Sequence, residues 1–221
     1  KEDMPAHSPL PAVSILVPAR NEADNIAACL NSLLKLDYPQ YEIIVIDDRS
    51  NDATPRILDK FKNTSTRLKV IHLSNLPSGW TGKTHALFQG VKIAQGEWFL
   101  FTDADTVHKP LSLKNAVSYS LERNLDLLSL YPQSRNQSFW EKITQPLGGS
   151  ILTLWYPFEK VNTPGSPTAF ANGQYILIKK SSYLELGGHE AVKGELLEDV
   201  AMAGRAKEKN KITHQKITSS Y

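Results

Sequence analysis

Short apolar runs alternate with longer amphipathic segments along the first half of the chain. Four of the runs have the length of a buried strand, and the segments between them repeat their apolar residues at helical spacing. Strands are expected at 13–17, 42–46, 68–73 and 98–101, and helices at 26–34, 54–62 and 83–94. This alternation is typical of a parallel sheet with crossover helices, and therefore of an α/β fold.

The second half of the chain has a less regular pattern. Its spacing predicts helices over 111–123, 139–156 and 195–209, strands over 126–130 and 175–178, and a loop over 162–167. The chain has 221 residues, of which 41% are hydrophobic and 22% charged, so it can bury one sizeable core. We therefore expect one globular domain over residues 1–221.

Composition narrows the possible partners. A formal net charge of +2 gives no strong field for an acidic polymer, so no nucleic-acid partner is expected. The single cysteine, Cys29, has no partner for a disulfide within the chain or for a cysteine metal site, which favours a reducing compartment. No apolar run approaches the roughly 18 residues that cross a bilayer, and no signal peptide opens the chain.

An acidic motif, Thr102-Asp103-Ala104-Asp105, directly follows the fourth expected strand. Residues two apart in an extended chain share a face, so the carboxylates of Asp103 and Asp105 can converge on one hard cation. Mg²⁺ or Mn²⁺ held there can neutralise a diphosphate leaving group. The alternative is a solvated acidic turn, or an aspartate that caps the next helix.

Asp47 and Asp48 end the second expected strand, where open α/β sheets bind their ligands. Their carboxylates can accept hydrogen bonds from a base N–H and a ribose hydroxyl. The next residues contain Asp52 and Thr54, either of which can cap the following helix. Helix capping explains Asp52 but not Asp47, which is costly beside an apolar run unless it is paired.

The stretch Gly79-Trp80-Thr81-Gly82-Lys83-Thr84 superficially resembles a phosphate-binding P-loop. A P-loop needs a glycine five residues before Gly82, and Pro77 holds that position, so this reading is excluded. Lys83 can still contact an anionic donor as a point charge.

A Glu198-Asp199 pair opens the last expected helical segment. On its own, such a pair is explained by the favourable interaction of acidic residues with the helix dipole. Its place in the order of motifs supports a functional reading instead.

These motifs together resemble family 2 glycosyltransferases. The resemblance extends from Val13 to about Lys209, and its specificity lies in the order of the motifs rather than in any one of them. They are Val17-Pro18-Ala19-Arg20-Asn21-Glu22, the acidic run from Asp47 to Thr54, Asp103-Ala104-Asp105, Asn172-Gly173-Gln174, Gly187-Gly188-His189 and Glu198-Asp199. The stretch 79–87 resembles the branch that acts on lipid acceptors, including hopanoid-associated, carotenoid-type and ceramide glucosyltransferase-like members.

The resemblance implies a GT-A fold, with a Rossmann-like, mostly parallel sheet flanked by helices. A nucleotide-sugar-binding half would cover about 13–105, and an acceptor half with the catalytic base about 106–221. The implied reaction is metal-dependent, inverting transfer of a hexose from a UDP-sugar to a hydroxyl of a lipid-like acceptor. We expect this domain at the cytoplasmic face of a membrane, with hydrophobic segments lying outside residues 1–221.

The same resemblance assigns roles to individual residues. Asp199 would be the general base that deprotonates the acceptor hydroxyl, with Glu198 beside it. Asp103 and Asp105 would bind Mn²⁺ or Mg²⁺. The residues expected to bind the nucleotide-sugar are Pro18, Arg20, Glu22, Asp47, Asp48, Lys83, Asp103, Ala104, Asp105, Asn172 and Gly173.

Two other functions share part of this pattern. A nucleotidyltransferase has a related sheet and acidic metal site, but usually opens with a glycine-rich loop, and 18–22 contain no glycine. A catalytically inactive nucleotide-sugar-binding module would lack a metal or base carboxylate, whereas Asp103, Asp105 and Asp199 are all present. One departure from the family is that nothing in 200–221 matches the Gln-x-x-Arg-Trp motif of many processive members.

Overall fold

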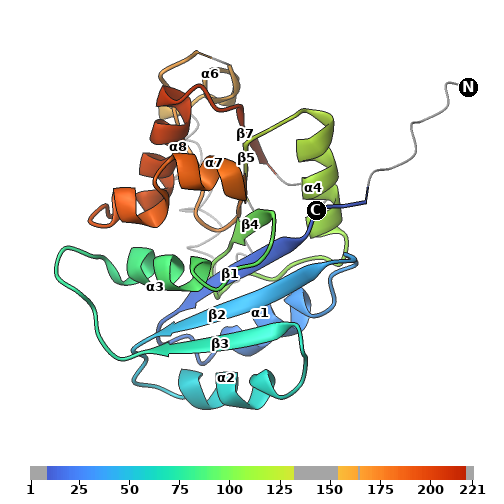
Figure 1. Ribbon diagram of the computed structural model, residues 1–221, viewed down its shortest axis with the longest axis vertical. Helices are drawn as coiled ribbons and strands as arrows, with labels where there is room; N and C mark the ends of the chain where they lie inside the picture. Colours follow the sequence, from blue (N-terminus) through green and yellow to red (C-terminus); the bar gives the residue numbers. More distant parts are fainter. Residues whose placement is uncertain (1–8, 132–153, 164, 218–221) are drawn as a thin grey trace, which may run out of the picture.

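The computed structural model describes residues 9–131, 154–163 and 165–217, and within them a mixed seven-stranded sheet has helices on both faces (Figure 1). The strand order is β3-β2-β1-β4-β6-β5-β7. The strands are β1 (Val13–Ala19), β2 (Tyr41–Asp48), β3 (Leu68–Leu73), β4 (Trp98–Phe101), β5 (Leu127–Tyr131), β6 (Ile176–Lys179) and β7 (Thr213–Ile217). The helices are α1 (Ile26–Leu33), α2 (Thr54–Lys62), α3 (Gly82–Val91), α4 (Ser112–Glu122), α6 (Phe158–Asn162), α7 (Lys180–Glu185) and α8 (Glu198–Glu208), with a 3₁₀ turn η1 (Gly188–Val192).

The sheet opens between β1 and β4. Both strands run parallel, but their pairing ends at Leu16 and Phe101, while β1 stays paired with β2 as far as Ala19 and Asp47. Pro18, which has no N–H to donate, lies beyond the last residue pair with β4, where its missing donor breaks no ladder bond on that side. A crevice therefore begins where these two strands separate, the place where open α/β sheets bind ligands.

Alternating side chains of the central strands build a core on each face of the sheet. Ile15 and Val17 of β1 point into one core with buried residues of α1, α2 and α4, whereas Leu16 points into the other core with residues of α3, α7 and α8. These three side chains are fully buried. Burying each such side chain is worth about 1.5–3 kcal/mol, so the two cores fix the ends of the strands that carry the site.

The elements expected in the first half are confirmed, with α2, β3 and β4 at the predicted bounds and the others within three residues. The helix expected from residue 195 begins instead at Glu198, since the acidic pair of residues 198–199 forms its first turn and favours the helix dipole there. The helix predicted over 139–156 lies outside the described residues except for its last three. α6, α7, η1 and β7 were not predicted, because these segments are short and β7 has a polar sequence, THQKI.

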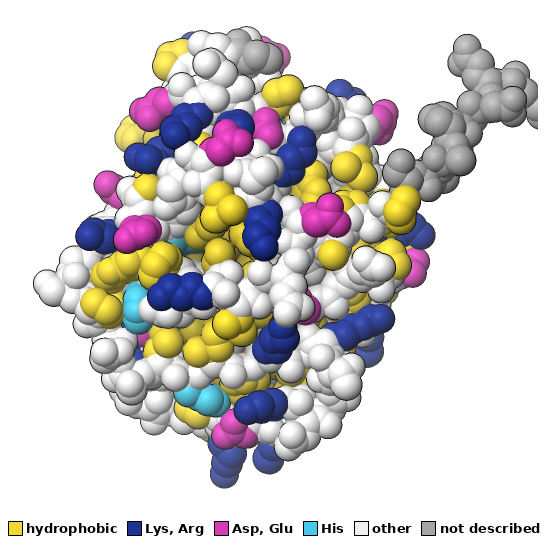
Figure 2. Space-filling model, in the orientation of Figure 1, with side chains coloured by type: hydrophobic (Ala, Val, Ile, Leu, Met, Phe, Trp, Pro, Cys, Tyr) yellow, Lys and Arg dark blue, Asp and Glu magenta, His cyan; other side chains and the backbone are white. Residues whose placement is uncertain are grey.

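Charges of both signs are interspersed over the face of the molecule drawn in Figure 2, with hydrophobic side chains between them. The charged side chains of that face therefore form no large patch that is only positive or only negative. Within 9–131, 154–163 and 165–217, no helix combines the length and the apolar character needed to span a bilayer.

Candidate active site

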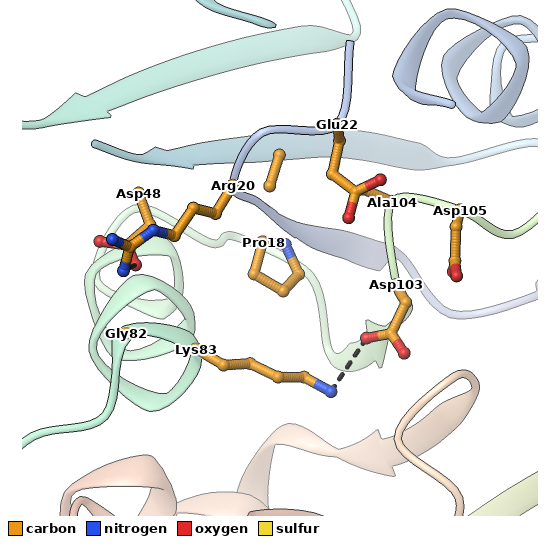
Figure 3. Close-up of a pocket in the computed structure, with 10 residues that line it drawn as sticks. Pro18, Arg20, Glu22, Asp48, Gly82, Lys83, Asp103, Ala104 and Asp105 are labelled. Carbon is orange, nitrogen blue, oxygen red and sulfur yellow. Dashed lines mark ion pairs between the residues drawn. The ribbon is translucent and has the colours of Figure 1, made fainter. Parts of the chain in front are cut away.

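A cleft of about 380 Å³ lies at the carboxyl ends of β1 and β4. Figure 3 shows its residues converging from the end of β1, the end of β2, the start of α3 and the loop after β4. It is lined by Pro18, Ala19, Arg20, Glu22, Asp48, Gly82, Lys83, Asp103, Ala104 and Asp105. The structure thus brings together eight of the residues expected to bind a nucleotide-sugar or a metal, although they come from four separate segments.

The loops that follow β1 and β2 are tied to each other. The amide N–H of Asn21 donates to Ser50 Oγ at 2.9 Å, and the amide of Glu22 donates to Thr54 Oγ1 at 2.8 Å. Asn21 has a left-handed backbone, with φ of 55°, which asparagine tolerates better than most residues. These bonds hold one wall of the cleft in a fixed shape.

Asp48 is buried beneath this wall and is paired with arginine. Arg49 donates from Nε to Oδ1 at 2.8 Å and from Nη2 to Oδ2 at 3.1 Å, while Nη1 of Arg20 lies 3.7 Å from Oδ2. Gly82 lies against the same carboxylate, because a Cβ at this position would collide with Asp48 Oδ2. The first turn of α3 can approach β2 this closely only with glycine at position 82.

Asp47 does not line the cleft, although it was expected to bind the nucleotide. Its Oδ2 lies 2.8 Å from His72 Nδ1, and its Oδ1 accepts from the amide of Ser50 at 3.2 Å. The hydrogen bond between His72 and Asp47 is the main cause of the raised pKa of His72, and burial of the imidazole acts in the opposite direction. His72 was missed in the sequence, but the register places it directly opposite Asp47 in the β2–β3 pair, which would have indicated the contact.

Lys83 is the cation at the centre of the site. Its Nζ lies 2.9 Å from Asp103 Oδ1 and 2.9 Å from Glu198 Oε1, so it joins the loop after β4 to the start of α8. Figure 3 shows the side chain stretched across the cleft toward Asp103. Burial alone would lower the pKa of Lys83, but the two carboxylates raise it above its ordinary value, so the amine stays charged.

Asp199 lies on the far side of Lys83, beside the loop that precedes β6. Its Oδ2 accepts a hydrogen bond from the amide of Gly173 at 2.8 Å, and its Oδ1 accepts from the amide of Val200 at 2.8 Å. Asp199 is half-buried, whereas Glu198 is buried with its carboxylate on Lys83. A dipole effect at the helix start does not explain these specific contacts, which place the pair beside Lys83 and the loop at Gly173.

Asn172, which was expected to bind the nucleotide-sugar, and His189 of the Gly187-Gly188-His189 motif both have structural contacts. Asn172 Oδ1 accepts from the amide of Gln174 at 2.9 Å, and its own amide donates to Ser129 Oγ at 2.8 Å, which shapes the loop that presents Gly173. His189 is buried, with Nδ1 2.8 Å from the hydroxyl of Tyr183. Burial lowers the pKa of His189 to about 3, so this imidazole is neutral.

The carboxylates of the cleft have the chemistry of a hard-cation site. Burial raises the pKa of Asp103, Lys83 lowers it again, and the nearby charges of Asp105 and Asp199 raise it further. Among the described residues, no group of three or more His, Cys, Asp or Glu side chains is arranged so that it could hold a metal ion by itself. Two carboxylates, with substrate phosphates and water completing the shell, are the set that Mg²⁺ commonly takes, and this arrangement fits Asp103 and Asp105.

Curated relatives match most of this chain. A beta-monoglucosyldiacylglycerol synthase from Trichormus variabilis is 33% identical over 171 residues, which cover 76% of this chain and 36% of that protein. A 4,4'-diaponeurosporenoate glycosyltransferase from Staphylococcus aureus is 28% identical over 194 residues, which cover 86% of this chain and 50% of that protein. The chain therefore spans half or less of the length of these relatives.

Solved structures confirm the GT-A type of fold. A mannosyltransferase from Pyrobaculum calidifontis in complex with GDP-Man and Mn²⁺ superposes with a TM-score of 0.71 at 21% identity, covering 95% of this chain and 57% of that one. TarS 1-349 from S. aureus in complex with UDP-GlcNAc gives a TM-score of 0.64 at 23% identity, covering 95% and 56%. Residues 14–187 match the sequence profile of Glycosyl transferase family 2. The order of motifs, the fold and this match agree, and the chain belongs to glycosyltransferase family 2.

Proposed function

We propose that this domain transfers a hexose from a UDP-sugar to a hydroxyl group of a lipid-like acceptor, with inversion at the anomeric carbon and with Mn²⁺ or Mg²⁺. The observation that carries the proposal is the position of Lys83, which contacts Asp103 on the donor side and Glu198, the neighbour of Asp199, on the other. A donor in the cleft and a base at the start of α8 would thus face one reaction centre.

The donor would lie in the cleft between β1 and β4. Arg20 and Lys83 supply positive charge to its walls, Pro18 and Ala104 supply apolar contact, and Gly82 leaves room at the start of α3. Complexes of two structural neighbours with GDP-Man and UDP-GlcNAc support a nucleotide-sugar as the ligand. The choice of UDP rests on the resemblance to family members and is the part that a donor panel tests.

The reaction would follow from the position of Asp199. Its carboxylate takes the proton of the acceptor hydroxyl as the acceptor oxygen attacks the anomeric carbon. The bond from that carbon to the β-phosphate oxygen breaks, and UDP leaves with the electron pair. The Gly173 amide holds one carboxylate oxygen of Asp199 at 2.8 Å and so orients the base.

Asp103 and Asp105 would hold the divalent cation. When bound, Mn²⁺ or Mg²⁺ would act as a Lewis acid that neutralises charge on the departing diphosphate. The Mn²⁺ in the mannosyltransferase complex supports this assignment. The ammonium of Lys83, fixed beside Asp103, adds a second positive charge on the same side.

The acceptor class and the location are inferred from the relatives. By their names, the two curated relatives synthesise beta-monoglucosyldiacylglycerol and glycosylate 4,4'-diaponeurosporenoate, and both compounds are lipids. A lipid hydroxyl lies at a membrane, so we infer that the domain works at a membrane, at its cytoplasmic face where UDP-sugars are made available. Family membership removes the nucleotidyltransferase alternative, whereas an inactive binding module is left to experiment.

A donor panel tests the proposal. The purified domain would be incubated with UDP-glucose, UDP-galactose, UDP-GlcNAc and GDP-mannose, each with Mn²⁺ and with dioleoylglycerol in mixed micelles, and nucleotide release would be measured. We expect release from a UDP-hexose that depends on the acceptor and stops in EDTA. Release of nucleotide from GDP-mannose alone would show that the donor is not a UDP-sugar. Donor binding without release of nucleotide in any mixture would favour a catalytically inactive binding module.

A further inference from the structure

Lys83 contacts more groups of the protein than a residue that only binds the donor would need. Its ammonium lies between two carboxylates, Asp103 and Glu198, at 2.9 Å from each. A Cβ built on Gly173 would lie 2.9 Å from the same Nζ, so the ammonium also touches the loop that holds Asp199. One positive charge thus reaches all three segments that form the reaction centre.

The start of α3 aims this side chain. The carbonyl of Lys193 accepts from the amide of Thr81 at 2.9 Å and from the hydroxyl of Thr84 at 2.8 Å, so residues on both sides of Lys83 are fixed to the loop before α8. Thr81 also caps α3 by accepting from the amide of Thr84. The backbone on each side of Lys83 therefore cannot shift without breaking contacts to the acceptor half.

The charge balance at this point is strongly negative without Lys83. Asp103, Asp105, Glu198 and Asp199 bring four carboxylates together, and Asp105 and Asp199 are close enough to disfavour ionisation of Asp103. Lys83 contacts two of the four. Arg20, which also lines the cleft, pairs instead with Asp48, with its Nη1 3.7 Å from Asp48 Oδ2.

We propose that Lys83 is an internal counter-ion, which neutralises Asp103 while no metal is bound and keeps Glu198 and the start of α8 in place. This inference rests on the proposed function, because it assumes that Asp103 is a metal ligand. Lys83 then gives up Asp103 when a divalent cation takes that carboxylate, and keeps its contact with Glu198. It is a positioning residue for Asp199, acting through Glu198 and through the Gly173 loop.

If Lys83 is a counter-ion of Asp103, loss of its charge should make the free protein bind a divalent metal more tightly, not more weakly. A divalent cation at Asp103 competes with the ammonium and is repelled by it, and a unit charge a few ångström away changes an affinity by roughly tenfold at a partly exposed site. A residue that served only to bind the donor would not weaken metal binding to the free protein.

The test is a calorimetric titration of MnCl₂ alone into the domain without nucleotide. We expect Lys83→Met, which keeps the length of the side chain and removes its charge, to bind Mn²⁺ about tenfold more tightly than the wild type. Glu198→Gln should do the opposite and bind Mn²⁺ more weakly, because it leaves Lys83 with Asp103 as its one remaining carboxylate contact. It also keeps the test open if Lys83→Met does not fold.

Arg20→Met is the matched control. It removes one positive charge from the same cleft but from a residue that pairs with Asp48, so the Mn²⁺ affinity should change by less than about threefold. Equal or weaker Mn²⁺ binding by Lys83→Met, or an equal gain in Arg20→Met, would overturn the counter-ion role. Absence of Mn²⁺ binding to every variant, with UDP-sugar binding intact in EDTA, would instead overturn the metal requirement of the proposed function and this inference with it.

Discussion

The amide of Gly173 donates a hydrogen bond to Oδ2 of Asp199 at 2.8 Å. This bond connects the loop before β6 with the first turn of α8, two segments that share no secondary-structure element. This hydrogen bond fixes the orientation of the Asp199 carboxylate beside Lys83. The position of the proposed base therefore depends on a backbone group, which a side-chain motif alone does not reveal.

Gly173→Ala should lower kcat by roughly 10- to 100-fold, because a Cβ there would lie 3.2 Å from Asp199 Oδ2 and 2.9 Å from Lys83 Nζ and would displace the base. The donor affinity should change little. Steady-state rates with calorimetry of UDP-sugar binding check this split. The control is Gly204→Ala in α8, where nothing lies within 4 Å of the added Cβ, and normal rates are expected. A Gly173→Ala enzyme with an unchanged kcat would mean that this loop does not position the base.

Asp105→Ala should reduce Mn²⁺-dependent binding of the UDP-sugar by at least about tenfold, because one of two carboxylate ligands is lost. EDTA should have the same effect on the wild type and little further effect on the variant. Calorimetry with and without Mn²⁺ measures both. Asp37→Ala, at a side chain that is 65% exposed and bonded to Lys114, should behave as the wild type. If neither EDTA nor the Asp105→Ala substitution changes the affinity for the UDP-sugar, the assignment of Asp105 as a metal ligand is wrong.

The pair of His72 and Asp47 should make stability depend on pH. The hydrogen bond to Asp47 raises the pKa of His72 above its ordinary 6.5, so its stabilising charge is fully present below about pH 6.5 and lost as the pH rises through the raised value. The difference in Tm between wild type and His72→Gln should therefore be larger at about pH 5.5 than at about pH 9. The effect should stay below about 1 kcal/mol, since the His72 side chain is 39% exposed. A difference that grows toward high pH would contradict the ion pair.

Two leucines beside the proposed base are candidates for contact with the acceptor chain. Leu196 is 88% exposed and Leu197 67% exposed, and they directly precede Glu198. Replacing both with serine should raise the KM for a long-chain diacylglycerol by about tenfold and leave the rate with a short-chain analogue unchanged, because burial of such a side chain is worth roughly 1.5–3 kcal/mol. Leu121→Ser on α4, at a side chain 46% exposed, is the control. An equal change in KM for the long-chain and the short-chain acceptor would show that Leu196 and Leu197 do not contact the acceptor chain.

Much of the fold was predictable, because the first half alternates strongly between buried strands and amphipathic helices. α2 and β3 begin and end at the predicted residues. The second half is less regular, and β7 escaped prediction because a polar edge strand, THQKI, has no apolar run to reveal it. The start of α8 was predicted three residues early, since periodicity alone does not locate the helix start at the acidic pair.

The candidate site was predicted as a set of residues but not as a set of contacts. Sequence order placed Asp103, Asp105 and Lys83 at strand and helix ends, where the structure has them. The pairing of Lys83 with Glu198 depends on how α3 and α8 both pack against η1, which no local pattern encodes. Asp47 was expected in the nucleotide pocket from its place at a strand end and from the family resemblance, whereas its contact with His72 depends on the β2–β3 register, which the sequence pattern did not define.

The central claim is that Asp199 is the base of an inverting transfer, and Asp199→Asn tests it most directly. The amide keeps the shape and can still accept the hydrogen bond of Gly173, but it cannot take a proton. We predict that kcat falls by about 10² to 10⁴ while calorimetric UDP-sugar affinity stays nearly normal, with Glu198→Gln milder. Near-normal turnover by Asp199→Asn, with the acceptor that the wild type uses, would contradict the account.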